Sequence, residues 1–126
     1  ARAALAWLRA RHGGHIAVVG YSFGAWVTTQ LVDKDVTAAV FVAPTLARHD
    51  YSGAALGMRP TLLVCGEGDF AAGEEECNRL DAKHGRVVLT RVPSGDHFFR
   101  GSEARVAEAV AEFVRAHTAA APGVAA

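Results

Sequence analysis

The sequence predicts an α/β fold, a parallel sheet of about four strands flanked by helices, and two observations lead to this prediction. The first is that short apolar runs alternate along the chain with segments whose apolar residues recur at helical spacing. The second is that the apolar runs are continuous, as at residues 38–43, which is typical of strands covered on both faces. Such strands, separated by helices, indicate a parallel sheet with right-handed crossovers.

The first half of the chain is expected to supply two helices and two strands. Residues 2–12 place apolar side chains at helical spacing, and the two glycines that follow end this helix. A strand at 15–20 leads into a helix at 23–32. The apolar run at 38–43 is the second strand, and the proline after it stops the strand.

The second half is expected to supply two further strands and two helices. Residues 44–59 show no strong period, so we interpret them as a loop with at most a short helix around 52–56. Strands at 61–65 and 86–92 enclose a helix at 73–84, whose acidic first turn suits the helix dipole.

The last helix is expected to follow Ser102, which can cap it. Its apolar residues fall on one face: Val106, Val110, Phe113 and Val114. We expect residues 1–117 to form one domain and residues 118–126 to form a flexible tail.

The composition is that of one globular domain and argues against several classes of protein. Hydrophobic residues make up 51% of the chain and charged residues 21%, which favours a packed core over disorder. Thirteen basic residues balance thirteen acidic ones, so neither nucleic acid nor an anionic membrane is an expected partner. No apolar run approaches the roughly 20 residues of a membrane span. We therefore expect a cytoplasmic protein.

The two cysteines, Cys65 and Cys77, fall in different predicted elements, a strand and a helix. Neither belongs to a C-x-x-C pair, so zinc or thiol chemistry has little support. We expect two ordinary thiols, with a disulfide as the alternative. The histidines at 12, 15, 49, 84 and 117 are scattered, so no metal site is expected.

A G-x-S-x-G motif, Gly20-Tyr21-Ser22-Phe23-Gly24, joins the first predicted strand to the second predicted helix. In that context it is typical of a nucleophile elbow, a strained turn that lifts the serine hydroxyl clear of the backbone. We expect both glycines because a β-carbon at either place would crowd strand against helix or block the turn. The alternative is a strand–helix turn with a chance serine.

Two other polar residues, Asp69 and His97, also follow predicted strands. Since the carboxyl ends of parallel strands share one edge of the sheet, we expect both to lie near Ser22. A serine hydroxyl is a poor nucleophile until a base takes its proton, and histidine can take and return that proton. An acid behind the histidine orients it. Glu67 is the weaker candidate for that acid, and we interpret Asp96 as a turn former.

These segments resemble the small, capless α/β-hydrolases of bacteria, serine hydrolases of the dienelactone-hydrolase-like kind. The resemblance rests on residues 20–25, 60–69 and 94–99 and covers most of 2–117, as the C-terminal part of such a domain. It implies that about four further strands would normally precede the first helix. It also implies that one oxyanion donor would come from that upstream segment, so the site within these 126 residues is expected to be incomplete.

The resemblance implies that Ser22 is the nucleophile, Asp69 the acid and His97 the base, with the Phe23 amide as part of the oxyanion hole and no cofactor. The expected activity is cleavage of a carboxylic ester or thioester. The alternatives are a peptidase or lactone hydrolase on the same fold, and a catalytically silent domain that serves in binding or assembly. The expected partner is a small-molecule ester, and exposed apolar surface where the upstream strands are missing would favour a homodimer.

Several aromatic residues flank the predicted catalytic positions and are candidates for substrate binding: Tyr21, Phe23, Phe70 and Phe98. Core packing is an equal alternative for each of them. The loop at 44–59 is too short for a lid domain, so an open pocket for small or medium substrates is expected.

Overall fold

A single parallel sheet organises the computed structural model, which describes residues 1–33, 35–51, 59–83 and 86–119. The strands lie in the order β1-β2-β3-β4, and every neighbouring pair is parallel. Their bounds are β1 (Ala17–Tyr21), β2 (Ala38–Val42), β3 (Thr61–Gly66) and β4 (Val87–Val92). The predicted fold class and number of strands are therefore confirmed.

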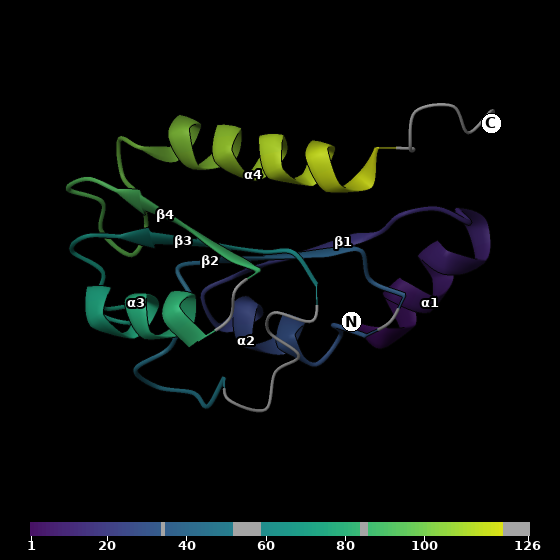
Figure 1. The fold of residues 1–126 in the computed structure, drawn as a ribbon, viewed down its shortest axis with the longest axis horizontal. Coiled ribbons are helices and arrows are strands. Elements are labelled where there is room, and N and C mark those ends of the chain that lie inside the picture. Colours follow the sequence, from purple (N-terminus) through teal and green to yellow (C-terminus); the bar gives the residue numbers. More distant parts are fainter. Residues whose placement is uncertain (34, 52–58, 84–85, 120–126) are drawn as a thin grey trace.

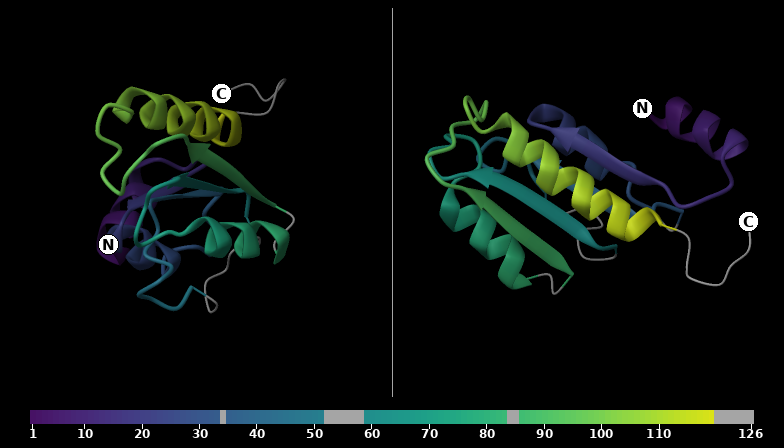
Figure 2. Two further views of the ribbon diagram at one scale, coloured as in Figure 1. Left: turned by 90° about the vertical axis from the view of Figure 1, so that its left-hand side faces the viewer. Right: turned by 90° about the horizontal axis from the view of Figure 1, so that it is seen from above.

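Helices cover both faces of this sheet (Figures 1 and 2). The helices are α1 (Arg2–Arg11), α2 (Phe23–Thr29), α3 (Glu74–Lys83) and α4 (Glu103–Thr118). Helix α4 lies alone on one face, whereas α2 and α3 lie on the other, and α1 lies beside the amino-terminal end of β1. This arrangement explains the continuous apolar runs, because each central strand buries side chains on both of its sides.

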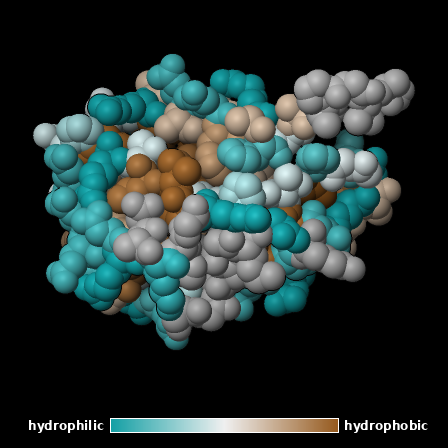
Figure 3. All heavy atoms as spheres, in the orientation of Figure 1, coloured by the Kyte–Doolittle hydropathy of each residue, from teal (hydrophilic) through white to brown (hydrophobic). Residues whose placement is uncertain are grey.

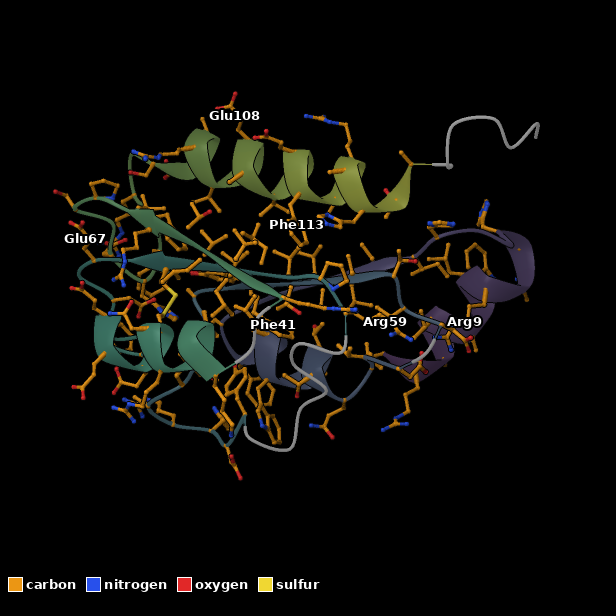
Figure 4. The ribbon with its side chains drawn as sticks, viewed as in Figure 1. Arg9, Phe41, Arg59, Glu67, Glu108 and Phe113 are labelled. Carbon is orange, nitrogen blue, oxygen red and sulfur yellow. A yellow bond between two sulfur atoms is a disulfide. The ribbon has the colours of Figure 1, made fainter. Side chains whose placement is uncertain are left out.

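The core consists of two apolar layers, one on each face of the sheet. Side chains alternate between the layers along β2: Val40 packs in the layer under α4, while Phe41 packs in the layer against the other helices. Figure 4 shows Phe41 pointing toward α2 and Phe113 of α4 pointing back toward the sheet. The expected apolar face of the last helix is confirmed, because it packs on the layer of Val40.

The observed helix bounds differ most from the prediction at α2, which ends at Thr29 instead of residue 32. The amides of Gln30 and Leu31 donate to carbonyls three residues back, at 3.1 and 2.9 Å, so the helix tightens into a final turn and stops. The short helix expected around 52–56 and the end of the expected tail, residues 120–126, lie outside the described residues.

A disulfide joins Cys65 of β3 to Cys77 of α3, so the expectation of two free thiols was wrong (Figure 4). The two cysteines are twelve residues apart in sequence. They meet because the loop between them reverses the chain and packs the start of α3 against β3. Both side chains belong to the same buried layer.

Apolar surface is exposed at the edge of the sheet that β4 forms. Figure 3 shows apolar surface between α3 and α4, over the edge that β4 forms. Val88 of β4 is 54% exposed at this edge. Within the part of the chain that the structure describes, no helix combines the length and apolar character needed to cross a membrane.

Candidate active site

Ser22 lies at the turn between β1 and α2, at the carboxyl end of the sheet. Its backbone has φ 55° and ψ −123°, a conformation that a non-glycine residue adopts only under strain. The Ser22 amide donates to the carbonyl of Val42, at 2.9 Å, which ties the turn to β2. The serine side chain is thereby held at the end of the strand and remains partly accessible.

Gly20 allows the close approach of strand and helix on which this turn depends. A β-carbon at Gly20 would lie within 3.0 Å of Thr28 Oγ1, the Gly24 carbonyl oxygen and Ala25 Cα. The expected crowding is therefore found at Gly20. At Gly24 it is not found, because a β-carbon there would meet nothing within 4 Å. The expectation for the second glycine was wrong because Gly24, the second residue of α2, has open space in the direction that a β-carbon would take.

A continuous chain of hydrogen bonds links Ser22, His97 and Asp69. Ser22 Oγ lies 2.8 Å from His97 Nε2, and His97 Nδ1 lies 2.9 and 3.0 Å from the two carboxylate oxygens of Asp69. An ionised carboxylate only accepts hydrogen bonds, so Nδ1 carries the proton and Nε2 presents a lone pair to the serine hydroxyl. The structure therefore brings together all three residues that the sequence placed at one edge.

Asp69 is buried, and its carboxylate accepts hydrogen bonds from backbone amides as well as from His97. Asp69 is 6% exposed, and its Oδ1 accepts hydrogen bonds from the amides of Ala71 and Ala72 at 2.7 and 3.2 Å. Hydrogen bonds of this kind offset the cost of taking a carboxylate out of water. Glu67, the weaker candidate, accepts the amide of Ser94 at the surface instead of facing His97.

The loop between β4 and α4, residues 93–102, carries His97 and is called the histidine loop below. It passes close over the end of β3, where a β-carbon on Gly66 would lie within 3.0 Å of the Gly95 backbone. The Gly68 amide donates to the Gly95 carbonyl at 2.9 Å. Asp96 Oδ1 accepts the amide of Phe98 at 3.0 Å, so its interpretation as a turn former agrees with the geometry.

The Phe23 amide opens α2 directly after the serine. It has no hydrogen-bond acceptor among the described residues, and it lies at the positive end of the helix dipole. An amide in this position can donate to an oxygen that becomes negative when Ser22 Oγ attacks a carbonyl carbon.

Three aromatic rings surround the His97 imidazole. The ring centroids of Phe70, Phe98 and Tyr21 lie 4.8, 5.3 and 5.9 Å from that of His97. Phe70 is 66% exposed and Phe98 is 53% exposed, so neither belongs to the core. Their exposed faces leave them free to contact a bound molecule.

Sequence reasoning missed a second group of side chains beside the elbow. The ring of His49 stacks on Trp26 at 4.9 Å and lies 5.4 Å from the ring of Phe23. Thr45 Oγ1 lies 2.8 Å from His49 Nδ1 and 3.1 Å from Tyr51 Oη, which also accepts the Thr45 amide at 3.0 Å. No periodic signal marks these residues, because the path of the loop after β2 alone brings them together. Among the described residues, no three His, Cys, Asp or Glu side chains converge on a point where they could hold a metal ion.

A family model described as the dienelactone hydrolase family matches residues 1–120. The chain belongs to this family. It is thus a member of an enzyme family with the α/β-hydrolase fold, and the resemblance inferred from the sequence is confirmed.

Solved structures and a curated protein are also similar to this chain. The structure of a protein of unknown function from Agrobacterium tumefaciens shares 26% identity and a TM-score of 0.77 over 95% of this chain and 62% of that one. An α/β serine hydrolase without lid from Xanthomonas campestris shares 24% identity and a TM-score of 0.82, over 96% of this chain and 56% of that one. An uncharacterized protein of Rickettsia prowazekii is 26% identical over 90% of this chain and 53% of its own length. This chain therefore spans between half and two thirds of the length of these three proteins.

Proposed function

We propose that this protein is a serine hydrolase that cleaves a carboxylic ester or thioester through a Ser22–His97–Asp69 triad. The observation that carries the proposal is the unbroken hydrogen-bond chain from an accessible serine hydroxyl, through an imidazole, to a buried carboxylate. The positive φ of Ser22 supports it, since backbone strain of this kind concentrates at functional sites.

In the acylation step, Ser22 Oγ attacks the carbonyl carbon of the substrate while His97 Nε2 takes the hydroxyl proton. The carbonyl oxygen becomes an oxyanion, toward which the Phe23 amide can donate. When the tetrahedral intermediate collapses, the bond to the leaving group breaks and His97 returns the proton to the departing alcohol or thiol. Ser22 is left as an acyl ester.

In the deacylation step, His97 takes a proton from water as the water oxygen attacks the acyl carbon. Collapse of the second intermediate releases the carboxylic acid, and Ser22 Oγ recovers its proton from His97. Asp69 remains ionised throughout and stabilises the imidazolium that forms twice in each cycle.

A lactone is an internal ester, so the same steps open it, and membership of the dienelactone hydrolase family favours lactones as a second substrate class. The exposed Phe70 and Phe98 rings beside His97 suit an apolar group of small or medium size. Faster turnover of long-chain than of short-chain esters would contradict this expectation.

The test is hydrolysis of p-nitrophenyl acetate and of a matching acetyl thioester by the whole gene product that contains these residues. We expect Ser22→Ala to lower both rates by several orders of magnitude, to the residual level that binding and oxyanion stabilisation supply, while the circular dichroism spectrum stays unchanged. If Ser22→Ala still hydrolyses either compound at the rate of the parent protein, the proposal is contradicted.

A further inference from the structure

The histidine loop has to span most of the sheet. Ser22 follows β1 and His97 follows β4, and two strands lie between them in the sheet. At about 4.8 Å per strand spacing, the ends of β1 and β4 lie roughly 14 Å apart, and the histidine loop together with the His97 side chain must bridge that separation. The position of the imidazole therefore depends on what holds the far end of this loop.

The hydrogen bonds that hold the near end of the loop are confined to β4, the residues directly after β3 and the loop itself. The Gly95 amide donates to the Val92 carbonyl, and the Gly95 carbonyl accepts the Gly68 amide. The Ser94 amide donates to Glu67, which Figure 4 shows at the end of the sheet where the strands finish. None of these contacts reaches β1.

Tyr21 supplies the contact at the far end. Its phenol oxygen donates to the backbone carbonyl of His97, at 2.9 Å, across 76 residues of sequence. The two rings are 5.9 Å apart with an interplanar angle of 32°. Tyr21 is the last residue of β1 and precedes Ser22, so the end of one strand holds both the serine and the backbone of His97.

The phenol is suited to act as a permanent donor. Burial raises the pKa of Tyr21, and the negative charges of Asp69 and Asp96 raise it further. The hydroxyl therefore stays protonated through the neutral range. The loop also contains two non-glycine residues with positive φ, Ser94 at 55° and Phe99 at 52°, so its path is one that outside contacts must maintain.

We propose that Tyr21 is a positioning residue whose hydroxyl holds the backbone of His97 so that Nε2 stays within reach of Ser22 Oγ. The proposal rests on the proposed function and departs from the expectation that Tyr21 lines the substrate pocket. A small displacement of a catalytic group lowers the rate steeply, by as much as about 100-fold for 1 Å.

The test uses the two tyrosines of the chain as a matched pair. Tyr21→Phe removes the hydroxyl that bonds His97, and Tyr51→Phe removes a hydroxyl that bonds only Thr45 among the described residues. We expect Tyr21→Phe to lower kcat for p-nitrophenyl acetate by about 10- to 100-fold with KM changed less than twofold. Tyr51→Phe should leave both constants within twofold of the parent. A raised KM with unchanged kcat in Tyr21→Phe would make Tyr21 a substrate contact and overturn the proposal.

A second readout separates this proposal from the proposed function. The Nδ1 proton of His97, held by Asp69, is observable by NMR in histidine-labelled protein without any substrate. We expect this signal to shift or broaden in Tyr21→Phe and to stay unchanged in Tyr51→Phe. An unchanged signal in Tyr21→Phe would overturn the positioning role even if the parent protein is an active enzyme. If the parent shows no hydrolysis that depends on Ser22 but the NMR signal changes as expected, only the proposed function is contradicted.

Discussion

Two histidines at the carboxyl end of the sheet sit in hydrogen-bond networks that differ in one respect. His97 Nδ1 faces the carboxylate of Asp69, whereas His49 Nδ1 faces the hydroxyl of Thr45. In the first network Nδ1 must carry the proton, because the carboxylate accepts only. The Nε2 lone pair is then available to Ser22.

The second network places no such constraint on its histidine. Tyr51 Oη accepts the Thr45 amide, and the hydroxyl of Thr45 lies within hydrogen-bond distance of both Tyr51 Oη and His49 Nδ1. A hydroxyl can donate or accept, so a proton on either ring nitrogen of His49 is compatible with this network. The partner of Nδ1 therefore decides whether the tautomer of a histidine is fixed, and only the carboxylate beside His97 fixes it.

The largest expected effect comes from giving Nδ1 of His97 a partner that can donate as well as accept. Asp69→Asn puts an amide beside His97 Nδ1, and the amide can donate to it, which moves the imidazole proton to Nε2 and removes the base. We expect kcat for ester hydrolysis to fall by about 10⁴-fold with the fold intact. Asp96→Asn is the control, because the amide oxygen can still accept the Phe98 amide. Comparable losses in both variants would mean that the Asp69 carboxylate does not fix the His97 proton as described.

The elbow that places Ser22 in the first network is sensitive to a single β-carbon. Gly20→Ala forces that carbon against Thr28 and the start of α2, so we expect the free energy of unfolding to fall by about 1–3 kcal/mol or more. Gly24→Ala is the matched change on the other side of the serine, where the space is open, and should leave stability unchanged or slightly raised. Urea unfolding of both variants measures the difference, and equal losses would contradict the packing seen at the elbow.

The smallest expected effect belongs to the second network and is a pH dependence. Burial raises the pKa of Tyr51 above its ordinary value of 10.0, with hydrogen bonds to Thr45 acting in the opposite direction. Folding therefore favours the protonated phenol, and this part of the stability is fully present below about pH 10 and lost as the pH rises through the folded pKa. We expect Tyr51→Phe to lose less stability than the parent between pH 9 and 11 in thermal unfolding. Parallel curves for the two proteins would show that Tyr51 does not titrate in this way.

Much of the fold, and the grouping of Ser22, His97 and Asp69, could be predicted from the sequence for physical reasons. The run at 38–43 is continuous because helices cover β2 on both faces, so its pattern directly reflects its surroundings. Ser22, Asp69 and His97 could be grouped because parallel strands all present their carboxyl ends at one edge. These inferences need only the type and order of the elements.

The features that sequence reasoning missed depend on the paths of loops in space. The Cys65–Cys77 disulfide requires the chain reversal before α3, and neither local pattern around the cysteines reports it. The contact of Tyr21 with the His97 carbonyl joins residues 76 positions apart through a backbone atom, which no side-chain pattern marks. The order of strands and motifs in the sequence could group the residues at the carboxyl edge of the sheet, but it could not show which of these residues are in contact.

Ser22 should react with a fluorophosphonate probe if His97 and Asp69 activate it as a nucleophile. The measurement is the mass of the protein and of its Ser22 peptide after exposure to the probe, for the parent, Ser22→Ala and Asp69→Asn. We expect one adduct on Ser22 in the parent, none in Ser22→Ala, and a much slower reaction in Asp69→Asn. A folded parent protein that remains unlabelled, or an equal rate in Asp69→Asn, would contradict the proposed triad.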